Sequence, residues 1–135
     1  MMIEALSHIT LIVRDVDRTA QLLRIIFDAE ETYDSEGKNY SMSREKFFNI
    51  GHTWIAIMEG ESRLERSYDH VAFKVTDEEF DAYAARVRAM GLKILPGRER
   101  MPGEGRSLYF YDYDNHLFEL HTGTLEERLR HYRAS

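Results

Sequence analysis

Alternating hydrophobic and polar positions mark two segments of the chain, residues 3–13 and residues 70–75. Both are rich in β-branched or aromatic residues, so each is predicted to form a strand. A histidine stands near the start of each segment, His8 in the first and His70 in the second. The shared pattern indicates two halves of similar design, although their sequences differ.

The remaining elements are expected in the same order in both halves. Asp17 is placed to cap a helix, and Thr76 with Glu79 forms a capping box before another helix, which ends near Gly91. A last helix is expected at 124–132. Short strands are predicted at residues 31–33, 47–50, 54–58, 93–95, 107–111 and 117–121.

The order of these elements is βαβββ, repeated once. It predicts an α+β fold in which paired βαβββ modules form curved, mixed and mostly antiparallel sheets around a cavity that can hold a metal. We expect one domain over residues 1–135, with module one at about 3–60, module two at about 67–122 and a terminal helix at 124–132.

Composition narrows the class of protein. The chain has 135 residues, is 43% hydrophobic and carries a net charge of -6, which fits a globular domain and argues against nucleic acid as a partner. No apolar run reaches the roughly 18–20 residues that cross a bilayer, and the N-terminus lacks the features of a signal peptide. The absence of cysteine excludes disulfides and thiolate chemistry, so we expect a cytoplasmic protein that does not bind membranes.

Three side chains form a candidate metal site. Strand alternation places His8 and His70 opposite the apolar faces of their strands, and Glu119 opposite its apolar neighbours Phe118 and Leu120. Two imidazoles and one carboxylate suit a divalent transition metal and leave coordination positions open. Each of these residues alone fits a structural role, and only the equivalent positions of the histidines favour a site. His52, His116, His121 and His131 are expected to be structural or exposed, with His121 as a reserve ligand.

Several motifs resemble those of a known family. The stretches SHITLIV, SREKFF, ERSYDHVAF and GEGRSLYFYDYDNHLFELHTGTLEERL are similar to the vicinal oxygen chelate superfamily, and most closely to its FosX-type fosfomycin-resistance epoxide hydrolases. The resemblance covers residues 3–132. It implies a homodimer with exchanged modules and shared active sites, each holding Mn(II) or another divalent metal. The ligands would be His8, His70 and Glu119, with the first histidine facing ligands from the other subunit.

The same resemblance implies a reaction. The substrate would be fosfomycin, a small epoxide that bears a phosphonate, and water would open the epoxide to an inactive diol. Glu45 in SREKFF would be the general base, although without the resemblance it reads as a surface acid beside Arg44 and Lys46. The residues that would contact the substrate are Thr10, Trp54, Arg106, Ser107, Tyr109 and Arg128.

Other functions stay open at this point, among them a related enzyme for small phosphonates or epoxides with weak activity on fosfomycin. Thiol transferases of the same superfamily, of the glutathione type, act on fosfomycin but carry a lysine-containing, potassium-binding loop, whereas residues 97–106 here contain no lysine. Arg98, Arg100 and Arg106 are the candidates to replace that lysine. An isomerase of the glyoxalase type is disfavoured because Ile57 stands where an acid is usual. A metal-free drug-binding protein has no use for the three candidate ligands.

Overall fold

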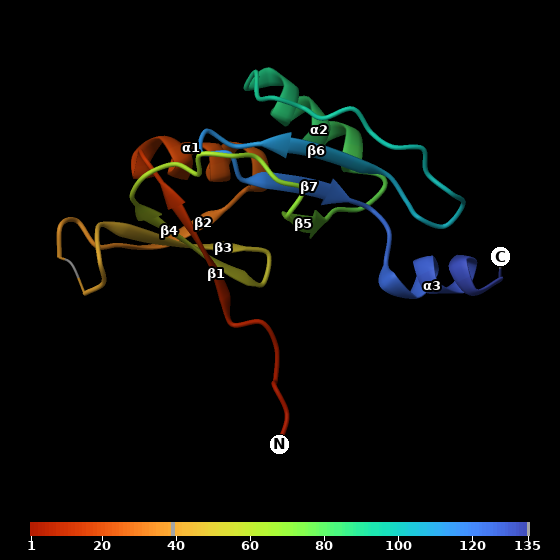
Figure 1. Ribbon diagram of the computed structural model, residues 1–135, viewed down its shortest axis with the longest axis horizontal. Helices are drawn as coiled ribbons and strands as arrows, with labels where there is room; N and C mark the ends of the chain where they lie inside the picture. The colour runs from red at the N-terminus through yellow and green to blue at the C-terminus, as the bar shows by residue number, and fades with distance from the viewer. Residues whose placement is uncertain (39, 135) are drawn as a thin grey trace. The chain divides into compact units, whose positions relative to one another are not determined.

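The computed structural model describes residues 1–38 and 40–134, and the chain divides into two compact units after Leu64 (Figure 1). The first unit contains four strands and one helix: β1 (His8–Val13), α1 (Val16–Phe27), β2 (Glu30–Asp34), β3 (Glu45–Ile50) and β4 (Thr53–Glu59). The second unit contains three strands and two helices: β5 (His70–Lys74), α2 (Phe80–Ala89), β6 (Ser107–Tyr111), β7 (Leu117–His121) and α3 (Leu125–Ala134).

Both sheets are mixed. In the first, the strand order is β1-β4-β3-β2, with β1 parallel to β4 and the other pairs antiparallel. In the second, the order is β5-β7-β6, with β5 parallel to β7 and β6 antiparallel to it. The two sheets therefore repeat one arrangement, in which the first strand of the unit lies parallel to its last strand.

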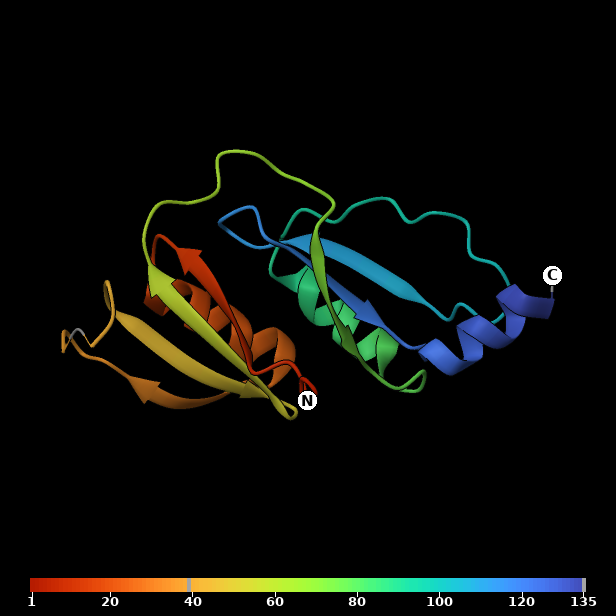
Figure 2. The ribbon, with the colours of Figure 1, turned by 60° about the horizontal axis from the view of Figure 1, so that its bottom comes forward.

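One helix covers one face of each sheet (Figure 2). Helix α1 packs on β3 and β4, and α2 packs on β7. In β1 the side chains of Leu11 and Val13 are buried, whereas His8 and Thr10 are exposed, as strand alternation requires. Burial of apolar side chains under α1 thus fixes the opposite face of the strand as the one that carries polar groups.

The first strand begins later than the sequence indicated, and the first helix begins two residues earlier. The first strand starts at His8 and not at residue 3, because the preceding residues pair with no other strand. The cap of α1 is Asp15, not the predicted Asp17: Asp15 has an extended backbone, and its carboxylate accepts the Arg18 amide at 3.0 Å. Asp17 lies in the first turn and pairs with Arg44 instead.

The strand expected at 93–95 is reduced to a single bridge between Ile94 and Phe110. Two backbone hydrogen bonds accompany it, from Leu95 to Tyr109 and from Tyr111 to Lys93. Pro96 follows directly and has no amide to donate, so the ladder ends there. The predicted capping box forms only in part. The Thr76 hydroxyl accepts from the Glu79 amide and donates to Glu79 Oε1, and this pair closes the turn before α2, which starts at Phe80.

No helix in the described parts of the chain, residues 1–38 and 40–134, is both long and apolar enough to span a membrane.

Candidate metal and anion site

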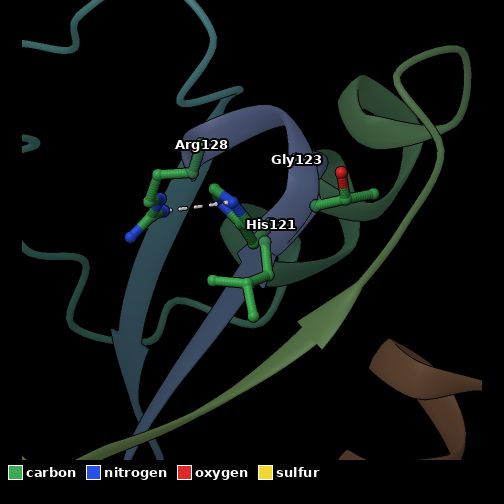
Figure 3. Close-up of a pocket in the computed structure, with 5 residues that line it drawn as sticks. His121, Gly123 and Arg128 are labelled. Atoms are coloured by element: carbon green, nitrogen blue, oxygen red, sulfur yellow. Dashed lines mark hydrogen bonds between the residues drawn. The ribbon is translucent and has the colours of Figure 1, made fainter. Parts of the chain in front are cut away.

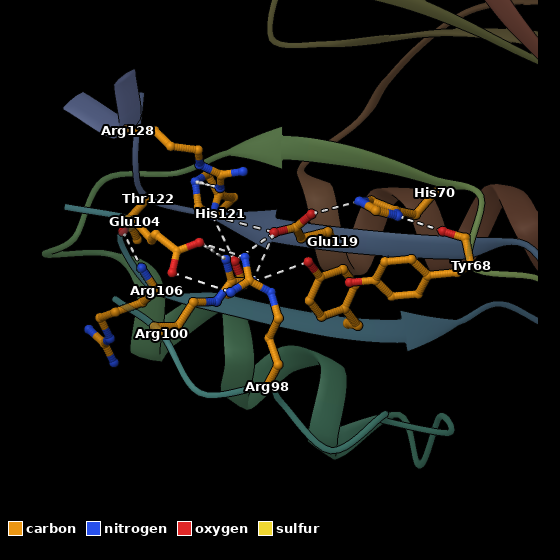
Figure 4. Close-up of polar contacts among 12 residues, drawn as sticks. Tyr68, His70, Arg98, Arg100, Glu104, Arg106, Glu119, His121, Thr122 and Arg128 are labelled. Atoms are coloured by element: carbon orange, nitrogen blue, oxygen red, sulfur yellow. Dashed lines mark hydrogen bonds and ion pairs between the residues drawn. The ribbon is translucent and has the colours of Figure 1, made fainter. Parts of the chain in front are cut away.

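Two predicted ligands meet in the second unit. The Nε2 atom of His70 lies 3.1 Å from Oε1 of Glu119 (Figure 4). The other ring nitrogen, Nδ1, is 2.7 Å from the carbonyl oxygen of Tyr68, which can only accept, so Nδ1 carries the hydrogen. The remaining ring nitrogen, Nε2, faces the carboxylate oxygen.

This contact fits a divalent cation. A ring nitrogen and a carboxylate oxygen this close share either a proton or a cation, and ligand atoms bound at about 2.1 Å to one metal can lie at such a distance from each other. The Tyr68 carbonyl fixes the ring of His70 in the way that outer-shell partners usually orient a histidine ligand. His70 and Glu119 could thus supply one nitrogen and one oxygen to a metal.

The third predicted ligand, His8, lies in the first unit. Its ring stacks on Trp54 with centroids 4.0 Å apart, and Ser7 Oγ lies 2.9 Å from its Nδ1. Over residues 1–38 and 40–134, no three His, Asp or Glu side chains gather closely enough to hold a metal. Of the three candidate ligands in the described residues, His70 and Glu119 therefore lie together in the second unit, and His8 lies in the first.

A chain of hydrogen bonds leads from Glu119 to Arg128. Ser107 donates to Glu119 Oε2 at 2.6 Å, and its Oγ also lies 2.7 Å from His121 Nδ1. Arg128 Nη2 lies 3.3 Å from His121 Nε2. Arginine only donates, so Nε2 of His121 accepts and Nδ1 carries the hydrogen given to Ser107. Burial lowers the pKa of His121, which favours this neutral form.

The end of this chain borders a pocket of about 200 Å³ (Figure 3). His121, Gly123, Thr124, Leu125 and Arg128 line it. Arg128 belongs to α3 and His121 ends β7, so the link between the strand and the helix brings them together. The pocket offers one guanidinium and backbone groups, which suits a small anion.

Tyr109 and Arg100 also lie beside Glu119. The strand register pairs Tyr109 with Glu119, and Arg100 Nη2 lies 3.1 Å from the Tyr109 hydroxyl and 3.8 Å from Glu119 Oε2. Burial, followed by a hydrogen bond with Tyr68, raises the pKa of Tyr109 to about 12. The hydroxyl consequently keeps its proton at neutral pH and stays a hydrogen-bond donor.

The other two loop arginines point elsewhere. Arg98 pairs with the buried Glu104 at 2.6 Å. Arg106, predicted to contact the substrate, pairs with Asp77 and Asp81 near the start of α2, and its guanidinium lies 4.3 Å from the centre of the Phe80 ring. The structure does not bring Arg106 to Glu119.

The first unit gathers its candidate residues on one sheet face. The register pairs His8 with Trp54, Thr10 with Ala56, and Glu45 with Met58. Directly paired residues point to the same side and alternate residues share a face, so His8, Thr10, Trp54 and Glu45 lie on one face. This is the face opposite α1.

The neighbours of Glu45 point away from it. Arg44 pairs with Asp17 at 3.0 Å and with Asp34 at 3.1 Å, and Lys46 pairs with Glu31 at 2.8 Å. These contacts hold strand β3 in place. The Glu45 side chain is only 9% exposed, and the Glu45 backbone amide donates to Ser35 Oγ at 3.0 Å. A buried acid in this position differs from the surface acid that the sequence alone suggested.

Two contributors to the site, Tyr68 and Glu104, were not foreseen, and His121 was predicted only as a reserve ligand. Tyr68 orients His70, His121 links Ser107 to Arg128, and Glu104 binds a loop arginine. Two of these three residues leave a trace in the sequence: Tyr68 stands two residues before His70, and His121 shares the strand face of Glu119. Glu104, an acid between two loop glycines, gives no such signal.

Comparison with known proteins places the chain in a family. Residues 5–120 match the Glyoxalase/Bleomycin resistance protein/Dioxygenase superfamily. The chain belongs to this superfamily. The chain is 60% identical over 131 residues to the fosfomycin resistance protein FosX of Listeria innocua, a match that spans 97% of this chain and 98% of that one. It is 35% identical to the metallothiol transferase FosB of Shouchella clausii, over 99% of this chain and 90% of that one.

A solved structure of the superfamily extends the comparison. A mutant of FosX from Listeria monocytogenes, complexed with Mn(II) and 1S,2S-dihydroxypropylphosphonic acid, is 56% identical and superposes with a TM-score of 0.90. The match covers 97% of this chain and 99% of that chain. The predicted α+β fold of paired βαβββ modules is confirmed by this similarity.

Proposed function

We propose that this protein is a Mn(II)-dependent epoxide hydrolase that opens the epoxide of fosfomycin to a diol and thereby confers resistance to the antibiotic. The observation that carries the proposal is the similarity to FosX bound to Mn(II) and a dihydroxypropylphosphonic acid. That ligand is the diol expected when water adds to the epoxide of fosfomycin. The substrate class is therefore a small phosphonate.

His70 and Glu119 of one subunit would hold the metal together with His8 of a second subunit, in a homodimer with shared sites. The 3.1 Å approach of His70 Nε2 to Glu119 Oε1 supports the first two ligands, and the exposed position of His8 on β1 supports the third. A bound divalent ion would supply Lewis-acid stabilisation of the charge that develops on the epoxide oxygen.

Residues of the second unit would bind the phosphonate. Arg128 borders the small pocket, and Ser107 and Tyr109 offer hydroxyl groups beside Glu119. Charge-assisted hydrogen bonds from fixed donors orient an anion strongly. Thr10 and Trp54, on the face of the first sheet that carries His8, would form part of the pocket wall.

Glu45 would act on the attacking water. As the water oxygen bonds to an epoxide carbon and the carbon–oxygen bond of the ring breaks, Glu45 takes a proton from the water. The ring oxygen would then take a proton from solvent, and Glu45 would release its own to solvent. Such general-base catalysis typically contributes about 10²–10⁴-fold in rate. The burial of Glu45 and the fixed backbone of β3 support this role.

A thiol transferase acting on fosfomycin is the second candidate, because the chain also matches FosB across nearly its whole length. In that reaction a thiol sulfur, not water, would bond to the epoxide carbon. Glu45 and the lower identity to FosB favour hydrolysis.

The proposal can be tested by phosphorus NMR. Metal-free protein is incubated with fosfomycin, with and without Mn(II) and without thiol, beside the variants Glu45→Gln and Glu36→Gln. We expect diol formation only with Mn(II), a loss of at least about a hundredfold in Glu45→Gln and no loss in the control. Conversion that begins only when a thiol is added would reject hydrolysis and make the protein a transferase.

A further inference from the structure

Glu104 is the most deeply buried acid of the glycine-rich loop. Its side chain is 0% exposed, and both of its oxygens have partners. Arg98 donates to both oxygens, at 2.6 and 3.2 Å, the amide of Met101 donates at 2.6 Å, and the Tyr132 hydroxyl also donates to it. These donors hold the pKa of Glu104 well below its usual range, so it is ionised.

Through Glu104 the loop holds helix α3. No described residue of α3 is buried, so the helix has little apolar packing to fix it. Its attachments to the loop are the Tyr132 hydroxyl on Glu104 and the ring of His131, which packs so closely on Gly103 that an added Cβ would come within 2.0 Å of it. Arg128 and Tyr132 are four residues apart and share one helix face, so the anchor at Tyr132 sets the place of Arg128.

The same carboxylate lies beside a second cation. Arg100 Nη1 is 3.9 Å from Glu104 Oε1, whereas Nη2 reaches towards Tyr109 and Glu119 (Figure 4). Nη1 is buried and has no hydrogen-bond partner among the described residues. A buried donor of this kind is costly unless a ligand completes it.

Arg98, and not Arg100, is the main partner of Glu104, so Arg100 is left to bind a ligand. Arg98 makes the close, bidentate contact with Glu104, while the Arg100 contact is longer, so Arg98 neutralises most of the charge of Glu104. Arg106 is bound to Asp77 and Asp81. Of the three loop arginines, only Arg100 combines a position beside Glu119 with an unsatisfied donor.

We propose that Glu104 is a positioning residue that fixes two cations of the anion site, Arg128 through Tyr132 and Arg100 through the loop. The two guanidinium groups would together bind a doubly charged phosphonate or phosphate. Cations held in place before binding lose little freedom when the anion arrives, so their arrangement governs affinity more than turnover. This inference rests on the proposed function for the identity of the anion, but not for the existence of the anion site.

The first experiment uses inorganic phosphate as the probe and calorimetry on the Mn(II)-loaded protein. Tyr132→Phe removes the hydroxyl and keeps the ring, and Tyr83→Phe on α2 is the matched control. We expect Tyr132→Phe and Glu104→Gln to weaken phosphate binding about tenfold, the usual effect of a lost charge-assisted hydrogen bond. Unchanged affinity in both, or no phosphate binding by the wild type, would overturn the inference even if fosfomycin is hydrolysed.

The second experiment separates positioning from folding. In hydrolysis of fosfomycin, Tyr132→Phe should raise KM about tenfold and leave kcat within about twofold, because binding of the anion is affected and the chemical step is not. In an Arg128→Ala background the same substitution should have no further effect on KM, since Tyr132 acts through Arg128. An additive effect, or a loss of kcat that follows thermal stability, would show that Tyr132 and Glu104 are merely structural.

Discussion

Ser107 occupies a central position among the residues of the second unit. It is the only described side chain that hydrogen-bonds both Glu119 and His121, at 2.6 and 2.7 Å. Its hydroxyl therefore orients a candidate metal ligand and also connects that ligand with Arg128. Outer-shell partners of this kind commonly affect how tightly the metal binds as well as how its ligands are oriented.

We expect Ser107→Ala to lower Mn(II) affinity about 10- to 100-fold, because Glu119 loses the donor that fixes its Oε2. Electron paramagnetic resonance of free Mn(II) during a titration measures this directly. Ser62→Ala, in the first unit, serves as the control and should bind as the wild type does. Equal affinity in the two variants would mean that Ser107 does not support the ligand.

Glu45 shows how far single residues can be interpreted from sequence. Alternation around His8 and Glu119 correctly predicted which faces they occupy, because strand geometry is local. The burial of Glu45 could not be predicted, since it depends on strand pairing with distant segments. Glu104 was missed for the same reason: its partners Arg98 and Tyr132 come from a loop and a helix that no periodicity connects.

At the scale of elements, strand β3 is stabilised by charges on the side that faces α1. Arg44 binds both Asp17 and Asp34, and Lys46 binds Glu31. Hydrogen bonds from Arg44 are the main cause that lowers the pKa of Asp34 from 3.8 to about 2. The ionised form of Asp34 is thus favoured by folding.

This pKa shift predicts a pH-dependent stability. A carboxyl with a lowered folded-state pKa stabilises the protein above its unfolded value of 3.8 and loses that contribution as the pH falls towards 2. Asp34→Asn should cost about 1 kcal/mol at pH 7, after allowance for solvent screening. Urea unfolding between pH 7 and pH 3 should show this difference shrinking, with Glu30→Gln as the control. A difference that is constant with pH would assign the loss to packing.

The residues at which helices and strands begin and end also depend partly on their neighbours in the sequence and partly on pairing with distant segments. The helix start near Asp15 was predicted within two residues, because both Asp15 and Asp17 are good capping residues and only the backbone conformation distinguishes them. The missing strand at 93–95 was harder to foresee. Its residues have strand-like character, but Pro96 limits the pairing to one bridge.

At the scale of the whole molecule, the division of the candidate ligands between the two units has a consequence for assembly. His70 and Glu119 lie in the second unit, whereas His8 lies in the first. In the proposed homodimer each site would combine the second unit of one subunit with the first unit of the other. Active sites of this kind can be restored by mixing two different defective subunits.

We therefore predict complementation between His8→Ala and Glu119→Ala. Each variant alone should be inactive, but a heterodimer would contain one site with all three native ligands. Unfolding, mixing and refolding of equal amounts should restore about a quarter of wild-type activity, because half of the dimers are mixed and each has one intact site. The pair His70→Ala and Glu119→Ala, both in the second unit, should restore none. No recovery in the first mixture would place each site within one chain.

Because His8 stacks on Trp54, the fluorescence of that tryptophan is an intrinsic probe of the His8 ring. The chain contains one tryptophan, and its indole lies 4.0 Å from the imidazole that is expected to bind metal. The tryptophan fluorescence of the protein therefore comes from a single position, next to His8. A paramagnetic ion or a proton that reaches that imidazole alters the intensity directly. Metal loading can consequently be followed in unlabelled protein.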